Sequence, residues 1–371
     1  MIFPPTAITL ALDFGDPYQD PLDDDDLMAE DVAEHWGTSA QQKDAVVRLL
    51  RTVCTKTQRL SDLTLSRYKH TVPLLGNILP LLPGLRRLDL SATSPLDVAT
   101  LHTLAGLDTL ETLTNAPIMN ARIDGAFTGF PAMKTLSLSG GVKDVVQLLT
   151  AVVSRLTSLT ITSYHSAMEW QTAFPRIEGP LSTLTAFRLH INACDTDLPD
   201  PDGTIRSNSE GVELEKFVAG LRAPLARVQT LRLSFDNIFM TCNDDQLARV
   251  APMFPHLTHF ELVVRGDWEG FPTITSVIAF ARHCPHLETL LLPNLHSNSK
   301  DMLAALRPSA PVHTALRVLC MLDMGDVKIA ARDVPLIGAV LAAIFPSLDV
   351  QACAEPPRTW THIDRDFPWS F

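Results

Sequence analysis

The amino-acid sequence predicts an α/β fold, specifically a leucine-rich repeat solenoid of about ten or eleven irregular strand-loop-helix repeats with a parallel sheet on its concave side. Three observations support this prediction. The template L-x-x-L-x-L recurs along the chain, prolines stand at a constant distance before it, and the segments between its copies have a helical period. Because 46% of the 371 residues are hydrophobic, the chain can bury a large core.

Large apolar residues occupy the first, fourth and sixth positions of the template. In the first half of the chain the copies are Leu60/Leu63/Leu65, Leu85/Leu88/Leu90, a degenerate Leu110/Leu113, Met133/Leu136/Leu138, Leu156/Leu159/Ile161 and Leu184/Phe187/Leu189. In the second half they are Val228/Leu231/Leu233, Leu257/Phe260/Leu262, Leu287/Leu290/Leu292, Leu316/Leu319/Met321 and a worn copy near Leu348. Most intervals lie close to the 20–29 residues of leucine-rich repeats, and one is 44 residues long.

Each repeat is expected to form a strand, a loop and a helix. Proline cannot continue a helix but can begin a strand, and five prolines lie two residues before the first apolar position. They are Pro83, Pro131, Pro255, Pro285 and Pro346. The apolar period predicts helices over 43–52, 142–153, 214–221 and 275–281. Asp244–Asp245 and Ser299–Asp301 are typical of residues that begin helices.

The chain divides into a repeat domain and three other segments. Residues 43–353 form the predicted repeat domain, and a Pro/Asp/Gly/Ser-rich loop insertion at 193–211 accounts for the long interval. Residues 1–42 carry a dense run of acidic residues and are expected to be a partly disordered N-terminal segment. Residues 354–371 contain four aromatic residues and are expected to cap the last repeat.

Charge and composition favour some classes of protein over others. The net charge of −12 disfavours a role in neutralising nucleic-acid phosphates, so no nucleic-acid partner is expected. No apolar run is long enough for a membrane span, and the first residues do not resemble a signal peptide. The six cysteines are scattered without a C-x-x-C pair, which favours a reducing compartment, the cytoplasm or the nucleus.

Catalytic, cofactor and metal sites are not predicted. No G-x-S-x-G, P-loop or G-x-G-x-x-G motif is present, and the prediction is a non-enzymatic protein without cofactor. An EF-hand aligned on Gly203 would put Leu198 and Ser209 at ligand positions, so it fails. A metal between the His256/His259 and His283/His286 pairs is disfavoured as well. An enzyme with its site at the insertion's aspartates remains an alternative; they are Asp195, Asp197, Asp200 and Asp202.

One part of the sequence resembles a known family. The stretch from Asn243 to Leu292 reads NDDQLARVAPMFPHLTHFELVVRGDWEGFPTITSVIAFARHCPHLETLLL. It resembles the leucine-rich repeat half of the F-box-like families of mushroom-forming fungi, where an N-D-D-x-L helix, a W/F-P-x-L strand, a tryptophan after a glycine and an A-R-H-C-P-x-L repeat recur in this order. The later MLDMGDVKI and AAIFPSL look like that family's closing repeats, so the resemblance covers about residues 45–350.

The resemblance implies the substrate-recognition half of an SCF-type ubiquitin ligase. In that role an F-box would bind the ligase adaptor and the repeats would choose the target. Family members usually begin with an F-box that opens with a Leu-Pro-x-Glu-like signal, and residues 1–42 contain no such signal. The expectation is therefore either an F-box upstream of Met1 or an F-box-less relative. The alternative function is a free-standing acidic leucine-rich repeat protein that binds or inhibits a partner, unrelated to ubiquitination.

The strand period predicts where a protein partner would bind. Positions two, four and six after the first leucine point to the concave face, because side chains alternate along a strand. That face is small and polar in the first half of the chain, charged in the middle and apolar at the end. The candidate partner-binding residues are Arg87, Asp89, Arg188, His190, Arg232, His259 and Glu261.

Two simpler interpretations of this face stay open. Serine and threonine suit exposed strands whether or not a partner binds there. The apolar end, from Leu291 to Leu322, either anchors a partner or is covered by the C-terminal tail, and coverage is favoured because a large exposed apolar patch promotes aggregation.

Overall fold

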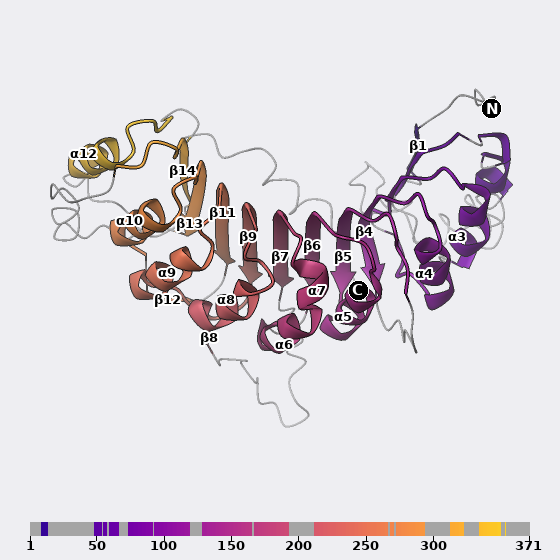
Figure 1. The fold of residues 1–371 in the computed structure, drawn as a ribbon, viewed down its shortest axis with the longest axis horizontal. Coiled ribbons are helices and arrows are strands. Elements are labelled where there is room, and N and C mark those ends of the chain that lie inside the picture. Colours follow the sequence, from indigo (N-terminus) through magenta and orange to yellow (C-terminus); the bar gives the residue numbers. More distant parts are fainter. Residues whose placement is uncertain are drawn as a thin grey trace, which may run out of the picture. The chain divides into compact units, whose positions relative to one another are not determined.

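The computed structural model confirms an α/β fold with a large parallel sheet, which has 11 strands among the described residues. The structure describes residues 9–13, 48–53, 55–57, 59–66, 73–91, 93–118, 128–164, 167–192, 211–265, 268–270, 272–293, 312–322, 334–349 and 353. The chain divides into two compact units, Met1–Arg155 and Leu156–Phe371, and each is described by itself. Figure 1 labels the elements of both units.

The first unit contains five parallel strands in sequence order. They are β1 (Thr9–Asp13), β2 (Asp62–Ser66), β3 (Arg87–Asp89), β4 (Thr112–Ile118) and β5 (Thr135–Gly140). Its helices are residues 48–53, α3 (Pro73–Ile78), η1 (Leu79–Leu81), α4 (Val98–Ala105) and α5 (Val142–Ala151). The register of β4 against β5 shifts between Leu113 and Ala116, where Asn115 adopts a φ of 54°.

The second unit continues the same alternation. Its long strands are β6 (Ser158–Ser163), β7 (Ala186–Asn192), β9 (Thr230–Asp236), β11 (His259–Arg265), β13 (Thr289–Pro293) and β14 (Val318–Leu322). Three two-residue strands form a separate small sheet: β8 (Val212–Glu213), β10 (Met240–Thr241) and β12 (Trp268–Glu269). The helices are α6 (Ala167–Ala173), η2 (Phe174–Ile177), α7 (Glu178–Leu181), α8 (Leu214–Arg222), α9 (Asp244–Val250), η3 (Ala251–Met253), α10 (Ile274–His283) and α12 (Val334–Ile344).

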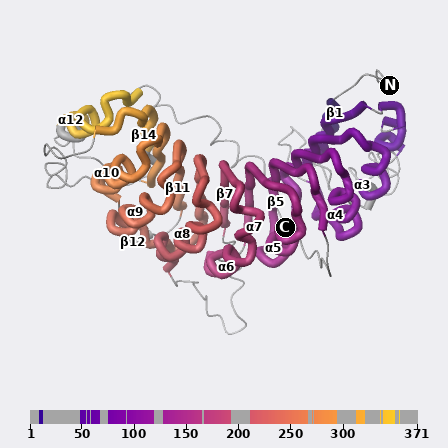
Figure 2. The backbone as a smooth tube through the Cα atoms, viewed as in Figure 1, coloured from indigo at the N-terminus to yellow at the C-terminus, as the bar shows by residue number. Residues whose placement is uncertain are grey.

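The template leucines explain the sheet. Those at the fourth position pair across parallel strands, as Leu63 does with Leu88 and Phe187 with Leu231. The apolar side chains at the fourth and sixth positions are buried, whereas the residue between them is half-buried in most strands, and β6 shows this alternation along its whole length. One side of the sheet therefore packs on the helices, and the chain in Figure 2 runs repeatedly from strand to helix and back. We call the other side, which carries the residues two, four and six places after the first leucine, the open face.

The prolines lie where the sequence predicts. Pro83, Pro255, Pro285 and Pro346 each stand in a turn between the end of a helix and the next template copy. The predicted helices at 142–153, 214–221 and 275–281 correspond to α5, α8 and α10, with ends that differ by at most two residues. The predicted helix start at Ser299–Asp301 lies outside the described residues.

Aromatic rings fill the core of the second unit. Phe174 stacks against Trp170, with ring centroids 5.6 Å apart, and meets Phe217 edge-on at 5.6 Å. Phe217 in turn meets Phe235 of β9 at 5.2 Å. Each of these rings is fully buried. The row joins α6, α8 and the sheet, so it stabilises the packing of helices on strands.

Side-chain caps hold the starts of α4, α9 and α10. Asn243 caps α9, its side-chain oxygen accepting the backbone N–H of Gln246 at 3.0 Å. This confirms the helix start predicted at Asp244–Asp245. Thr273 caps α10 by accepting the N–H of Thr275, and Asp97 caps α4 by accepting that of Thr100. Each cap satisfies a backbone donor that has no partner within its own helix.

Gly140 is required by the backbone. It ends β5 with a φ of +155°, and a Cβ built on it would lie 2.0 Å from the carbonyl oxygen of Ile118 on β4. The sequence suggested a turn after a strand at Gly140–Gly141. The structure places Gly140 in the last pair of that strand, and Gly141 directly before α5.

The acidic N-terminal segment contains a strand that the sequence did not predict. Residues Thr9–Asp13, within the segment expected to be partly disordered, pair with β2 along its full length. Leu10 and Leu12 are half-buried there. The acidic run at 23–26, most of the insertion at 193–211 and the tail at 354–371 lie outside the described residues. No helix in the described part of the chain is long and apolar enough to cross a membrane.

Candidate functional site

The charged centre of the open face lies in the second unit. Parallel pairing places Arg188 of β7 beside Arg232 of β9, and Arg232 beside Glu261 of β11, so three charged residues occupy one row across the strands. The residues six places after the first leucine form the next row, where His190 pairs with Ser234. The predicted residues thus come together because the template keeps the same register from strand to strand.

One of the two arginines in this row forms an ion pair with Glu261. The Nε of Arg232 lies 3.1 Å from Oε2 of Glu261, and both side chains are largely buried. Arg188 is exposed and forms no ion pair or hydrogen bond among the described residues. Partial desolvation, and then the positive charge of Arg232, lower the pKa of Arg188, while Glu261 opposes the change. Desolvation raises the pKa of Glu261, against the effect of the two arginines.

A second polar group lies at the ends of the same strands. His190 Nε2 is 2.9 Å from Oδ2 of Asp236, and Nη1 of Arg265 lies 3.7 Å from the same oxygen. The other carboxylate oxygen of Asp236, Oδ1, is buried without a hydrogen-bond partner. Both nitrogens therefore approach one oxygen, and Asp236 holds His190 at a fixed position on the open face.

His259, the remaining predicted residue of the second unit, belongs to the row of residues that lie two places after the first leucine. Its Nδ1 lies 2.8 Å from the hydroxyl of Thr258, and it pairs with Thr230 and Thr289 on the neighbouring strands. The structure thus places His259 two residues before Glu261 on the same face of the strand, one row away from the shared carboxylate.

The predicted residues of the first unit are engaged locally. Nε of Arg87 lies 3.5 Å from Oδ1 of Asp62, on the neighbouring strand. Oδ1 of Asp89 accepts hydrogen bonds from the hydroxyl of Ser91 at 2.8 Å and from the side-chain amide of Asn115 at 2.9 Å. Unlike Arg188, these charged groups already have partners, so this part of the open face offers less unpaired charge.

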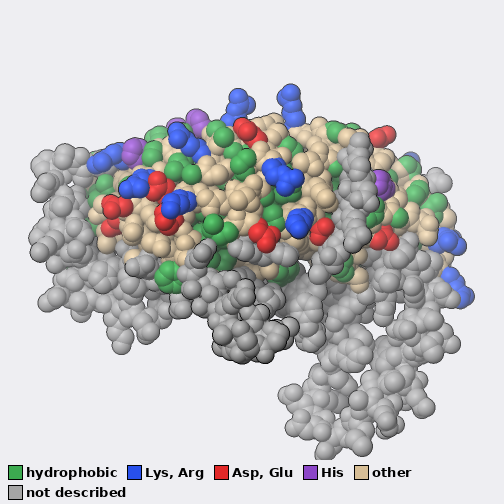
Figure 3. Space-filling view, turned by 90° about the horizontal axis from the view of Figure 1, so that it is seen from below, with side chains coloured by type: hydrophobic (Ala, Val, Ile, Leu, Met, Phe, Trp, Pro, Cys, Tyr) green, Lys and Arg blue, Asp and Glu red, His purple; other side chains and the backbone are tan. Residues whose placement is uncertain are grey.

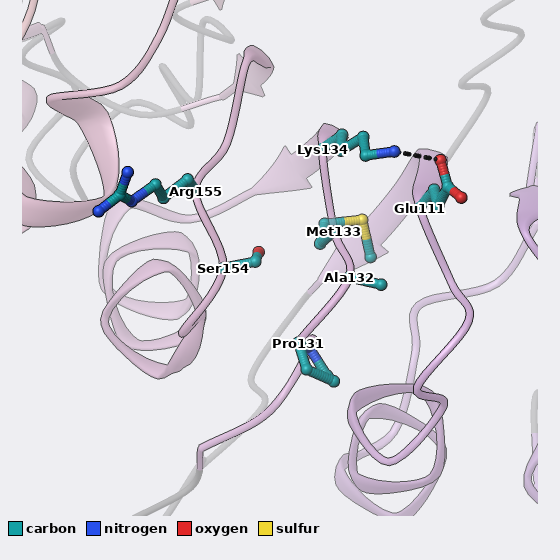
Figure 4. Close-up of a pocket in the computed structure, with 7 residues that line it drawn as sticks. All are labelled: Glu111, Pro131, Ala132, Met133, Lys134, Ser154 and Arg155. Atoms are coloured by element: carbon teal, nitrogen blue, oxygen red, sulfur yellow. Dashed lines mark hydrogen bonds and ion pairs between the residues drawn. The ribbon is translucent and has the colours of Figure 1, made fainter.

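The first unit also has a hollow in which oppositely charged side chains pair with each other. It has a volume of about 260 Å³ and is lined by Glu111, Pro131, Ala132, Met133, Lys134, Ser154 and Arg155. Figure 4 shows Lys134 extended toward Glu111, with Nζ 2.7 Å from Oε2, and Arg155 pointing away from this pair. The hydrogen bond and charge of Lys134 lower the pKa of Glu111. The hollow therefore contains an internal ion pair.

The apolar end of the open face is buried. Leu291 is 0% exposed, Cys320 5% and Val263 7%, and these residues pack together with Val318. They lie at open-face positions, so this burial removes them as an exposed apolar surface. The tail that was predicted to cover them lies outside the described residues.

The described residues contain no group of three or more histidine, cysteine, aspartate or glutamate side chains that could hold a metal ion. Four cysteines are free thiols: Cys242, Cys284, Cys320 and Cys353. Acidic and basic side chains are interspersed on the face of the molecule that Figure 3 shows, so the negative net charge does not form one acidic surface there.

Asp236 and Arg265 are site residues that the sequence analysis missed. They lie eight places after the first apolar residue of their template copies, in β9 and β11. Extending the alternation of the strand by two more residues would have identified them. Asp62 and Asn115 were missed for another reason, since their role depends on side-chain contacts with the next strand.

No model of a known protein family matches this chain, and no curated protein matches it either.

Proposed function

We propose that this chain is a leucine-rich repeat solenoid that acts as a non-enzymatic scaffold and binds another protein on its open face. The constant register of the template leucines and the alternation of strands with helices support the repeat assignment. Repeats of this kind present side chains from many strands to one partner, which suits protein recognition.

One observation carries the proposal. Arg188 is exposed in the middle of the open face, next to Arg232, which already pairs with the neighbouring carboxylate of Glu261. A charged side chain that lacks a partner in the free protein gains one when an anionic group of a partner arrives. Arginine is also among the residues that most often dominate binding interfaces. The partner therefore supplies an acidic group to this row.

The resemblance to fungal F-box-like proteins supports a more specific version of this function. In it, the open face is the substrate-recognition surface of an SCF-type ubiquitin ligase, and the ligase adaptor is contacted by an F-box. The free thiols suit a reducing compartment, so we place the protein in the cytoplasm or nucleus. A free-standing binding or inhibitor protein would use the same face without a ligase.

The test compares charge reversal on and off the open face. Tagged protein carrying Arg188→Glu is expressed with the proteasome blocked, and co-purified proteins are identified by mass spectrometry. We expect the variant to lose a partner that wild type retains, with an unchanged melting temperature. Arg222→Glu, at the end of α8, makes the same charge change away from the face and should retain the partner.

The outcomes distinguish the two versions of the function. Cullin and adaptor in the wild-type sample indicate a ligase subunit, and a different dominant partner without them indicates a free-standing scaffold. If the variant with reversed charge captures the same proteins as wild type, the open face is not the binding surface.

A further inference from the structure

A second hollow lies in the second unit, at the start of the strands rather than on the open face. It has a volume of about 360 Å³ and is lined by Arg227, Gln229, His256, Thr258 and His286. Arg227, His256 and His286 each directly precede the first apolar residue of successive template copies. Because β9, β11 and β13 are adjacent and in register, this position forms a column of three nitrogen-bearing side chains.

The three side chains in this column have no partner in the part of the chain that the structure describes. Arg227, His256 and His286 are all exposed and form no hydrogen bond or ion pair with the described residues. Thr258 adds a hydroxyl, which lies within 3.1 Å of the carbonyl oxygen of Gln229. The lining thus offers a guanidinium, two imidazoles and an amide that are able to donate hydrogen bonds to a ligand, while the hydroxyl of Thr258 is already engaged by Gln229 and His259.

The two hollows differ in their acidic residues. In the first unit, Glu111 lines the hollow and neutralises Lys134. No carboxylate is among the described residues that line the second hollow. Glu288 directly follows the first apolar residue of its template copy, as Gln229 and Thr258 do, but it does not line the hollow. Arg282 and His283 lie at the end of α10. The hollow therefore has positive charge and hydrogen-bond donors that a bound anion would satisfy.

We propose that Arg227, His256 and His286 bind a tetrahedral oxyanion, the dianion of a phosphate monoester or of free phosphate. A guanidinium donates two parallel hydrogen bonds to such a group, and the imidazoles donate from adjacent strands. Two histidines without a third metal-ligating residue, and with an arginine beside them, do not suit a cation. The site lies on residues other than those of the open face, so it stands independently of the proposed partner.

Sulfate is the suitable probe because it is a tetrahedral dianion, like the phosphate dianion, and its charge does not change near neutral pH.

The experiment follows the histidine side chains directly. The full chain is labelled with 13C-histidine, and the signals of His256 and His286 are assigned by their loss in His256→Gln and His286→Gln. Sulfate is then titrated against chloride of matched ionic strength at pH 7. We expect saturable shifts of both signals with sulfate and none with chloride.

Arg227→Gln tests the contribution of the guanidinium, and Arg222→Gln is the matched control with the same loss of charge outside the hollow. We expect the first to weaken sulfate binding by about threefold or more and the second to leave it unchanged. Inorganic phosphate and a phosphoserine peptide, titrated in parallel, distinguish a free from an attached ligand. Shifts that do not saturate, that match those with chloride or acetate, or that appear with Zn²⁺ alone would overturn the proposal.

Discussion

The carboxylate of Asp244 accepts hydrogen bonds from the backbone N–H of Thr273 at 2.8 Å and from its hydroxyl at 2.6 Å. Asp244 is the first residue of α9, and Thr273 caps α10. The same carboxylate also accepts from the backbone N–H and the hydroxyl of Ser276. One acidic side chain thus holds the start of the neighbouring helix, where negative charge is favourable.

Removing this contact should destabilise the second unit. Asp244→Ala leaves the N–H groups of Thr273 and Ser276 without the carboxylate, so we expect the free energy of unfolding to fall by about 2–3 kcal/mol. The adjacent Asp245 is exposed, and Asp245→Ala should cost about 0.5 kcal/mol. Urea unfolding followed by circular dichroism measures both. Equal losses in the two variants would contradict the role given to Asp244.

A second prediction concerns Gly140. Gly140→Ala places a methyl group against the carbonyl oxygen of Ile118 and forces a φ that alanine rarely adopts, so we expect a loss of about 2–3 kcal/mol. Gly179 in α7 has no atom within 4 Å of a Cβ built on it. Gly179→Ala should therefore be neutral or stabilise by up to about 1 kcal/mol. Melting temperatures compare the two, and a similar effect in both would refute the steric argument.

The aromatic row in the second unit gives a third prediction. Phe217 is fully buried between Phe174 and Phe235, so Phe217→Ala leaves a cavity that the neighbouring rings cannot fill. We expect a loss of about 3–5 kcal/mol in the free energy of unfolding. Phe217→Leu keeps most of the volume and should lose less than half of that. Equal denaturant midpoints for the alanine and leucine variants would contradict the predicted cavity cost.

The buried thiols should be unreactive and should make stability depend on alkaline pH. Burial raises the pKa of Cys242 and of Cys284 from 9.0 to about 12. Iodoacetamide attacks thiolates, so at pH 8 both should resist alkylation in the folded protein while the half-buried Cys353 reacts first. Peptide mass spectrometry reads the order of modification. Fast labelling of Cys242 or Cys284 without denaturant would argue against their burial.

The same pKa values fix the sign of the pH effect. Above pH 9 the unfolded chain releases both thiol protons, whereas the folded protein keeps them until about pH 12. The unfolded state therefore binds fewer protons, and stability falls as the pH rises past 9. Cys242→Ala should reduce this fall when urea midpoints at pH 8 and pH 10 are compared.

Much of the sheet could be predicted because it depends on a short repeated pattern. Leucines at the fourth and sixth positions must all point to one side, which fixes the strands, their register and the residues of the open face. Arg188, Arg232 and Glu261 fall in one row for this reason alone. The helix boundaries followed from prolines and capping residues, which act within a few residues of the backbone they affect.

Other features depend on contacts that a pattern does not contain. β1 lacks the first leucine of the template and has acidic surroundings, so only its pairing with β2 identifies it as a strand. Side-chain conformation decides which arginine, Arg188 or Arg232, forms the ion pair with Glu261. The burial of Leu291 and Cys320 on the open face also depends on what packs over them, which the local alternation does not encode.

The pairing of each strand with its immediate successor has a consequence for how the second unit folds. Hydrogen bonds between neighbouring strands join residues fewer than 50 apart, such as Thr258 with Gln229 and His190 with Asp236. Contact order is therefore low for a sheet of this size, and little loop-closure entropy is lost before native contacts form. The sheet can grow one strand at a time, in contrast to β-sandwiches, whose strands must first meet across long stretches of chain.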